Sequence, residues 1–149
     1  MSPTGREEER VLYQRAIFDG VPIPMFIVDE DVRIQDFNTA AEEFLGPESA
    51  TALDGLCGEA FHCVNAEEKS CGKAASCRAC AIRNSVNEAA CGTPVYRKMH
   101  VAKLRVQNRT VTQELLISAT LLPFTETPRV LLALEDVSRI AALRKALKG

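Results

Sequence analysis

Residues 20–46 read Gly-Val-Pro-Ile-Pro-Met-Phe-Ile-Val-Asp-Glu-Asp-Val-Arg-Ile-Gln-Asp-Phe-Asn-Thr-Ala-Ala-Glu-Glu-Phe-Leu-Gly. An apolar run over residues 25–29 ends in an acidic turn, and alternating residues follow over 32–37, which predicts a hairpin of two short strands. Asn38 then favours the start of a helix, because its side-chain oxygen can accept an orphan backbone N–H. Gly46 is suited to end that helix, since glycine reaches positive φ at little cost.

The sequence on either side predicts further helices and a longer set of strands. Apolar residues recur at helical spacing in the charged segment 6–18 and again in residues 137–148. Residues 47–76 have the weak periodicity of a loop with short helical pieces, whereas residues 77–90 have the pattern of a helix. Three segments are rich in Val, Leu, Ile and Thr, which is typical of strands: 95–106, 111–122 and 129–136. Because strands are segregated from helices, this order predicts an α+β domain with an antiparallel sheet.

Composition limits the class of protein. The chain has 149 residues, which suits one domain, and a net charge of -2. This balance gives no electrostatic basis for binding nucleic acid or an anionic membrane, and the 5% aromatic content argues against a platform for stacking bases. The charged N-terminus lacks the apolar run of a secretory signal, and no apolar run is long enough to span a membrane. We therefore expect a cytoplasmic location, with no membrane or nucleic acid as partner.

Two stretches resemble a PAS domain. Residues 20–46 are similar to its opening, with an apolar strand, an Asp turn, a second strand, an Asn cap and an Ala-rich helix that ends in Leu-Gly. Residues 134–138, Leu-Glu-Asp-Val-Ser, resemble its exit into a signalling helix. The resemblance covers residues 12–140. It implies a PAS-like five-stranded antiparallel sheet with helices on one face and flanking N- and C-terminal helices, and a sensory or dimerising role.

The resemblance divides the chain into a helical lead-in at 1–19, a PAS domain at 20–137 and a signalling helix at 138–149. A cysteine-rich insert occupies residues 57–80 of the PAS domain. The apolar series Ile140, Leu143 and Leu147 predicts that the last helix leaves the sheet and pairs with the same helix of a second chain. We expect a homodimer in which the lead-in helix supplies the rest of the interface, because about twelve residues are too few for a stable isolated helix.

Six cysteines in a compartment that keeps thiols reduced indicate metal or redox chemistry before disulfides. Four of them resemble the thiols of a cysteine-bearing subgroup of bacterial PAS domains, with the spacing C-x7-C-x5-C-x2-C: Cys63, Cys71, Cys77 and Cys80. Cys77 and Cys80 are the core of this pattern, because positions i and i+3 share one face at a helix start, where the helix dipole favours thiolate. The other two lie on a flanking loop that can fold over a shared centre.

Four thiolates suit either a tetrahedral zinc ion or an iron–sulfur cluster, and the spacing does not decide between them. A sensory fold favours a redox-active iron–sulfur cluster, since a structural zinc ion has nothing to report. Thiol–disulfide switching and inert packing as small hydrophobic groups are the open alternatives. Outside the four, Cys57 is an alternative ligand, Cys91 is interpreted as a packing residue, and His62 is interpreted as a loop residue before a further ligand or outer-shell donor.

The remaining residues give no basis for catalysis. The sequence has no Gly-rich phosphate loop, no Ser-His-Asp arrangement and no His-Glu-x-x-His motif, so we do not expect an enzyme. His100 lies on an expected strand, where it faces either a ligand pocket or solvent. The leading hypothesis is a sensor of redox state, oxygen or nitric oxide that uses an iron–sulfur centre and signals to an unknown downstream protein. The alternative is a PAS dimerisation or protein-interaction module with structural zinc or no metal.

Overall fold

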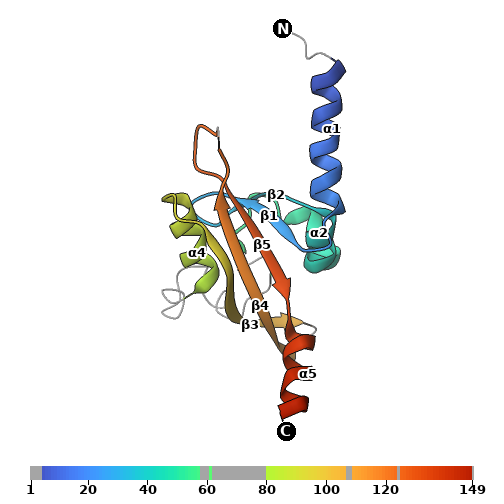
Figure 1. Ribbon diagram of the computed structural model, residues 1–149, viewed down its shortest axis with the longest axis vertical. Coiled ribbons are helices and arrows are strands. Elements are labelled where there is room, and N and C mark those ends of the chain that lie inside the picture. Colours follow the sequence, from blue (N-terminus) through green and yellow to red (C-terminus); the bar gives the residue numbers. More distant parts are fainter. Residues whose placement is uncertain (1–4, 58–60, 62–79, 107–108, 124, 149) are drawn as a thin grey trace.

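A computed structural model describes residues 5–57, 61, 80–106, 109–123 and 125–148 (Figure 1). The helices are α1 (Gly5–Gly20), α2 (Thr39–Leu45), the 3-10 helix η1 (Gly46–Thr51), α4 (Ala81–Ala90) and α5 (Ser138–Lys148). The strands are β1 (Met25–Val28), β2 (Ile34–Phe37), β3 (Val95–Val106), β4 (Arg109–Leu121) and β5 (Val130–Asp136). This order agrees with the predicted sequence of helix, two strands, helices, three strands and helix.

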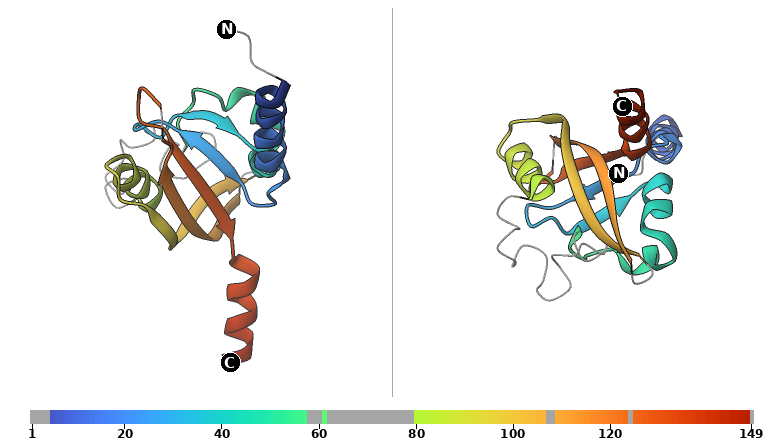
Figure 2. Two further views of the ribbon diagram at one scale, coloured as in Figure 1. Left: turned by 45° about the horizontal axis from the view of Figure 1, so that its top comes forward. Right: turned by 90° about the horizontal axis from the view of Figure 1, so that it is seen from below.

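The five strands pair in the order β2-β1-β5-β4-β3, and each neighbouring pair is antiparallel. This confirms the predicted α+β class and the five-stranded antiparallel sheet. Alternate residues of β4 and β5 are buried, among them Ile117, Leu132 and Leu134, which are fully inaccessible to solvent. Buried residues of α2 and α4 belong to the same core, so both helices cover one face of the sheet (Figure 2). Each such aliphatic side chain stabilises the fold by about 1.5–3 kcal/mol.

Helix α2 begins and ends where the sequence predicts. Asn38 is its N-cap, and the side-chain Oδ1 accepts the N–H of Ala41 at 2.9 Å. Gly46 follows the helix with φ 76°, a conformation that glycine adopts without the strain of a Cβ. The chain continues directly into η1, one of the short helical pieces expected in this region.

Two local features differ from the sequence-based expectation. Helix α4 begins at Ala81 and not at residue 77, because Cys80 has an extended backbone with φ −65° and ψ 116°. Strand β3 contains an irregularity between Val95 and Lys98, where Arg97 adopts φ 52° and donates its N–H to Ser118 Oγ at 3.0 Å. A regular alternation pattern does not predict this bulge, which inserts an unpaired residue into the ladder and increases the local twist.

Helices α1 and α5 project from opposite ends of the long axis of the molecule (Figure 1). Neither contains a buried residue. Leu12 is 71% exposed and Leu147 is 89% exposed. Residues 138–148 thus leave the sheet as a helix, and the exposed apolar residues of α1 and α5 lie toward opposite ends of the molecule. Among the residues described, no helix is long and apolar enough to cross a membrane.

Candidate functional site

The predicted metal-binding cysteines are only partly covered by the structure. Cys63, Cys71 and Cys77 lie outside the described residues, as does His62, whereas Cys80 lies within them. Within the described part of the chain, no group of three or more His, Cys, Asp or Glu side chains is placed to hold a metal ion. The four-cysteine centre therefore stays a prediction. The structure describes the residues on either side of Cys63, Cys71 and Cys77 in the sequence, which are called the two flanks below.

Cys80 forms the C-terminal flank. It occupies the N-cap position of α4, its carbonyl accepts the N–H of Asn84 at 2.9 Å, and its half-buried side chain makes no capping hydrogen bond. Residue 80 is extended and precedes the first residue of α4, whereas Cys77 lies outside the described residues, so the expected i, i+3 relation between the two stays a prediction. The thiol nonetheless lies at the positive end of a helix dipole, which favours an anionic ligand such as thiolate.

Cys57 and Phe61 form the N-terminal flank. Cys57 is only 2% exposed, its N–H donates to the carbonyl of Val32 at 3.0 Å, and its own carbonyl accepts the N–H of Phe61 at 2.8 Å. The ring of Phe61 packs against Phe26 of β1 and Phe44 of α2, with ring centroids 5.1 and 5.3 Å away. Such aromatic contacts are worth about 0.5–1.5 kcal/mol beyond their buried area. This flank is therefore built into the domain core.

Cys91 lies at the other end of α4 and is exposed, so its interpretation as a packing residue is wrong. The reason lies in the helical period. Buried residues of α4 recur at Ile82, Val86 and Ala89, and residue 91 falls about half a turn away from that stripe. The exposure of Cys91 therefore follows from its angle around the helix and not from its position at the helix end.

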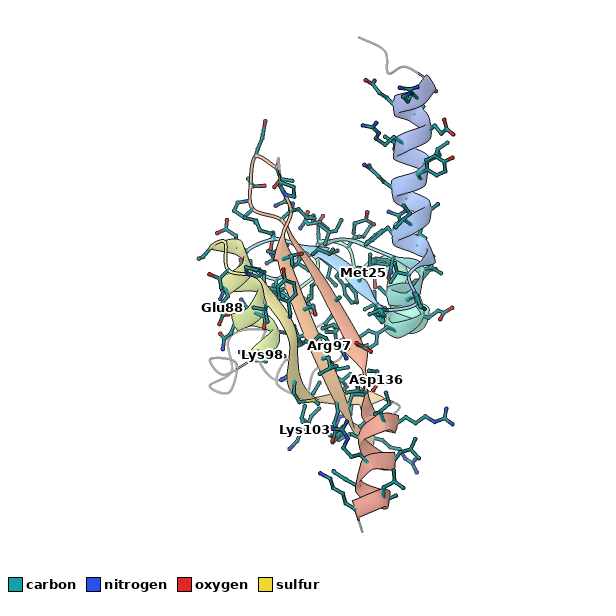
Figure 3. The ribbon with its side chains drawn as sticks, viewed as in Figure 1. Met25, Glu88, Arg97, Lys98, Lys103 and Asp136 are labelled. Atoms are coloured by element: carbon teal, nitrogen blue, oxygen red, sulfur yellow. The ribbon has the colours of Figure 1, made fainter. Side chains whose placement is uncertain are left out.

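The exit from β5 to α5 is tied to β4. Ser138 donates its N–H to Asp136 Oδ1 at 3.0 Å, and the Ser138 hydroxyl accepts the N–H of Glu114 at 2.8 Å. The N–H of Val137 donates to the carbonyl of Glu114 at 2.8 Å. Asp136 marks this junction in Figure 3. The segment 134–138, which resembles a PAS exit, thus connects the first turn of α5 to β4.

Comparisons with known proteins agree with this arrangement. The sequence pattern of the PAS domain family matches residues 12–79. A PAS domain of an HTR-like protein from Haloarcula marismortui superposes with a TM-score of 0.55 at 16% identity, covering 87% of this chain and 98% of that chain. The PAS domain of nitrogen regulation protein NR(II) from Vibrio parahaemolyticus gives a TM-score of 0.55 at 12% identity, covering 83% and 96%. This chain folds as a PAS domain.

A third structure extends the likeness of this PAS domain. A domain of a sensory box sensor histidine kinase/response regulator from Geobacter sulfurreducens gives a TM-score of 0.52 at 22% identity, covering 89% of this chain and all of that chain. The search of curated proteins found no match to the sequence of this chain. At these low identities the solved structures establish the fold, and the function has to be argued from the residues of this chain.

His100 lies on the helix-covered side of the PAS sheet. It shares a face of β3 with Ala102 and Leu104, both buried, and is itself half-buried. Burial lowers the pKa of His100 below its ordinary value, because desolvation disfavours the imidazolium form. The sequence left open whether His100 faces a pocket or solvent; the structure places it toward the interior, where burial favours the neutral imidazole.

Ser85 is a polar residue of the PAS core that the sequence interpretation missed. Its side chain is fully buried on α4, and its hydroxyl has no hydrogen-bond partner among the residues described. The sequence contained the signal for this burial. Counted from Ile82, the residues Ser85, Val86 and Ala89 follow at three, four and seven positions, which places all of them on one face of a helix. An unpaired buried hydroxyl costs about 1–3 kcal/mol.

Proposed function

We propose that this PAS domain is a sensory module that responds to redox state, oxygen or nitric oxide through an iron–sulfur centre held by Cys63, Cys71, Cys77 and Cys80. The observation that supports the proposal most directly is the position of Cys80. Its half-buried thiol stands at the start of a packed helix and takes no part in capping, so it is free to act as a ligand in a partly desolvated place. Two structurally similar domains, one of them described as a PAS domain, come from sensor histidine kinases, which supports a signalling role.

The chemistry of the four side chains fits such a group. Four thiolates complete the ligand set of an iron–sulfur cluster without a histidine, so His62 is not required. A bound cluster would supply a reduction–oxidation couple at these thiolates. The chain itself would hold the cluster between a buried N-terminal flank at Cys57–Phe61 and the start of α4.

A homodimer and an unidentified downstream protein are the proposed partners. The support is apolar surface that the described chain leaves uncovered. Leu143 on α5 is 59% exposed, and Met99 and Val101 on β3 are each more than half exposed. Met99 and Val101 point to the sheet face opposite the core, since their neighbours Ala102 and Leu104 are buried. Large exposed apolar patches commonly mark protein interfaces, and these exposed side chains are the residues proposed to contribute to one.

Metal content of cysteine variants tests the centre. We expect Cys77→Ser and Cys80→Ser each to abolish stoichiometric metal in protein purified without oxygen. Cys91→Ser is the matched control and should keep full metal content, because Cys91 is exposed about 16 Å along the helix axis from Cys80. The measurement is iron and zinc analysis together with the visible absorption spectrum.

The outcomes separate the two functions under consideration. Iron with visible absorption in the intact chain supports the redox sensor. Zinc without visible absorption favours the alternative, an interaction module with a structural metal. Unchanged metal content in Cys80→Ser would contradict the site assignment, and an intact chain without either metal would contradict the metal centre itself.

A further inference from the structure

The N-terminal flank of the cysteine insert is bonded to the outer edge of β2. The N–H of Ile34 donates to the carbonyl of Gly55 at 2.9 Å, and the N–H of Asp54 donates to the carbonyl of Ile34 at 2.7 Å. Leu56 forms an antiparallel bridge with Arg33, and Cys57 bonds to Val32. β2 is an edge strand of the sheet, so these bonds add a short sixth segment to that edge.

The turn that begins β2 is stiff. Val32 is buried and has φ 64°, which is an unusual conformation for a β-branched residue. The turn is held by Asp29, whose Oδ1 accepts the N–H groups of Asp31 and Arg33 and whose carbonyl accepts that of Val32. Strained backbone persists where the surroundings over-determine it. These hydrogen bonds restrain the segment that joins Val32, the partner of Cys57, to β2.

The other end of β2 holds α1. Arg15 Nη1 donates to Asp36 Oδ2 at 2.8 Å, and Arg15 Nη2 donates to the carbonyl of Phe37 at 3.4 Å. The same guanidinium donates from Nε to Asp19 at 2.9 Å, within α1 itself. Arg15 thus connects the body of α1 to the last residues of β2.

Asn38, directly after β2, completes the attachment. It is 1% exposed, and its Nδ2 donates to the carbonyls of Phe18, Val21 and Ile23. One side chain therefore joins the end of α1 to the start of α2. α5 has no comparable contact with β2, since its described attachments run to Glu114 of β4.

We propose that β2 is a mechanical link through which displacement of the Cys57–Phe61 flank reorients α1, so that α1 and not α5 reports on this flank. The inference rests on the proposed function for the stimulus that moves the flank, but not for the link itself. Coupling of this kind requires direct evidence of energetic dependence between the two ends.

The test is hydrogen exchange by mass spectrometry on the intact chain, from sub-second times onward, in peptides that cover α1, α2 and α5. Phe61→Ala loosens the flank, and Phe61→Leu is a milder second variant that keeps an apolar side chain if the first fails to fold. Asp36→Asn removes the charge that pairs with Arg15 but keeps the Oδ1 that accepts the N–H of Phe37. Asp19→Asn is the matched control, because it weakens a bond internal to α1.

We expect the Phe61 variants to speed exchange in the last two turns of α1 by about three-fold or more, while α5 changes by less than two-fold. In the Asp36→Asn background, the same Phe61 substitution should change the logarithm of the α1 exchange rate by less than half as much. In the Asp19→Asn background, it should keep most of its effect on that rate. Equal acceleration in α1 and α5, or an effect that is the same in the Asp36→Asn background, would overturn the link. None of these variants needs a bound metal for the measurement. A negative result would therefore count against the link and not against the proposed metal centre.

Discussion

Asn38 illustrates how much one side chain contributes to this domain. Besides its three donated bonds, its Oδ1 accepts the N–H groups of Met25 and Ala41. All five bonded groups belong to the backbone, and the side chain lies in the core. Removal of one partner leaves buried backbone groups unpaired, which costs more than the net value of the bonds themselves.

We therefore expect Asn38→Ala to lower the free energy of unfolding by about 2–4 kcal/mol, through the loss of a helix cap and the unpaired backbone groups. Urea denaturation followed by circular dichroism is the measurement. Asn87→Ala, at an exposed position of α4, is the control and should change stability by less than about 0.5 kcal/mol. Similar stabilities of the two variants would contradict this stabilising role of Asn38.

His100 gives the domain a dependence on pH. Its pKa is lower in the folded chain than in the unfolded chain, so between the two values the unfolded state binds more protons. The stability contributed by neutral His100 is present above the ordinary histidine pKa and is lost as pH falls through the lowered value. We expect His100→Gln to show a smaller loss of stability than the wild type between pH 8 and pH 5, measured by urea midpoints.

His62→Gln is the matched control for this pH dependence, because His62 is the other of the two histidines of the chain. It should leave the pH profile of stability unchanged if His100 is responsible. A profile that flattens in His62→Gln and persists in His100→Gln would reverse the assignment.

At the level of elements, α5 is a short amphipathic helix with no buried residue. Its exposed apolar residues lie on one side, and its basic residues lie elsewhere around the helix: Ile140, Leu143, Leu147, Arg139, Arg144, Lys145 and Lys148. A helix of 11 residues is marginal in water unless an apolar face is covered. A second copy of the chain is the proposed cover.

We expect the double substitution Leu143→Asp plus Leu147→Asp to convert a dimeric chain to a monomer, because two carboxylates would be desolvated in the paired seam. Sedimentation velocity is the measurement. Ala142→Asp is the control, since residue 142 lies on the opposite side of α5 and should not affect pairing. A monomeric intact chain, or a double variant that dimerises as before, would exclude the helix-paired dimer.

The strands and helices also show where local pattern is sufficient. The β1–β2 hairpin and the limits of α2 follow from neighbouring residues, namely an acidic turn, an Asn cap and a terminal glycine. The bulge of β3 does not, because it depends on a hydrogen bond from Arg97 to Ser118, which lies on another strand. The start of α4 at Ala81 does not follow from the pattern either, since the backbone of Cys80 is extended despite a helical pattern around it.

At the level of the whole molecule, the described chain flanks the cysteine insert with two different parts of the sheet. The flank at Cys57–Phe61 joins β1, β2 and α2, whereas Cys80 begins a helix that packs on β3, β4 and β5. The two terminal helices leave the sheet at opposite ends (Figure 1). The two flanks of the insert therefore contact different parts of the sheet.

The sequence by itself determined the class of fold, the number of strands and the residues that form α2, because hydrophobic period and capping are interactions between near neighbours along the chain. It also supplied the pattern of Cys63, Cys71, Cys77 and Cys80, which is a matter of spacing. Nothing in that pattern depends on how the sheet is assembled.

Only the tertiary structure decided the environment of individual side chains. Cys57 is buried because Val32 and Phe61 hold it against the core, and Cys91 is exposed because α4 packs on its opposite side. Asn38 reaches carbonyls 15 to 20 residues earlier in the chain, a role that its neighbours in sequence do not reveal. Burial and long-range hydrogen bonds depend on which surfaces meet, and that is set by the packing of distant segments.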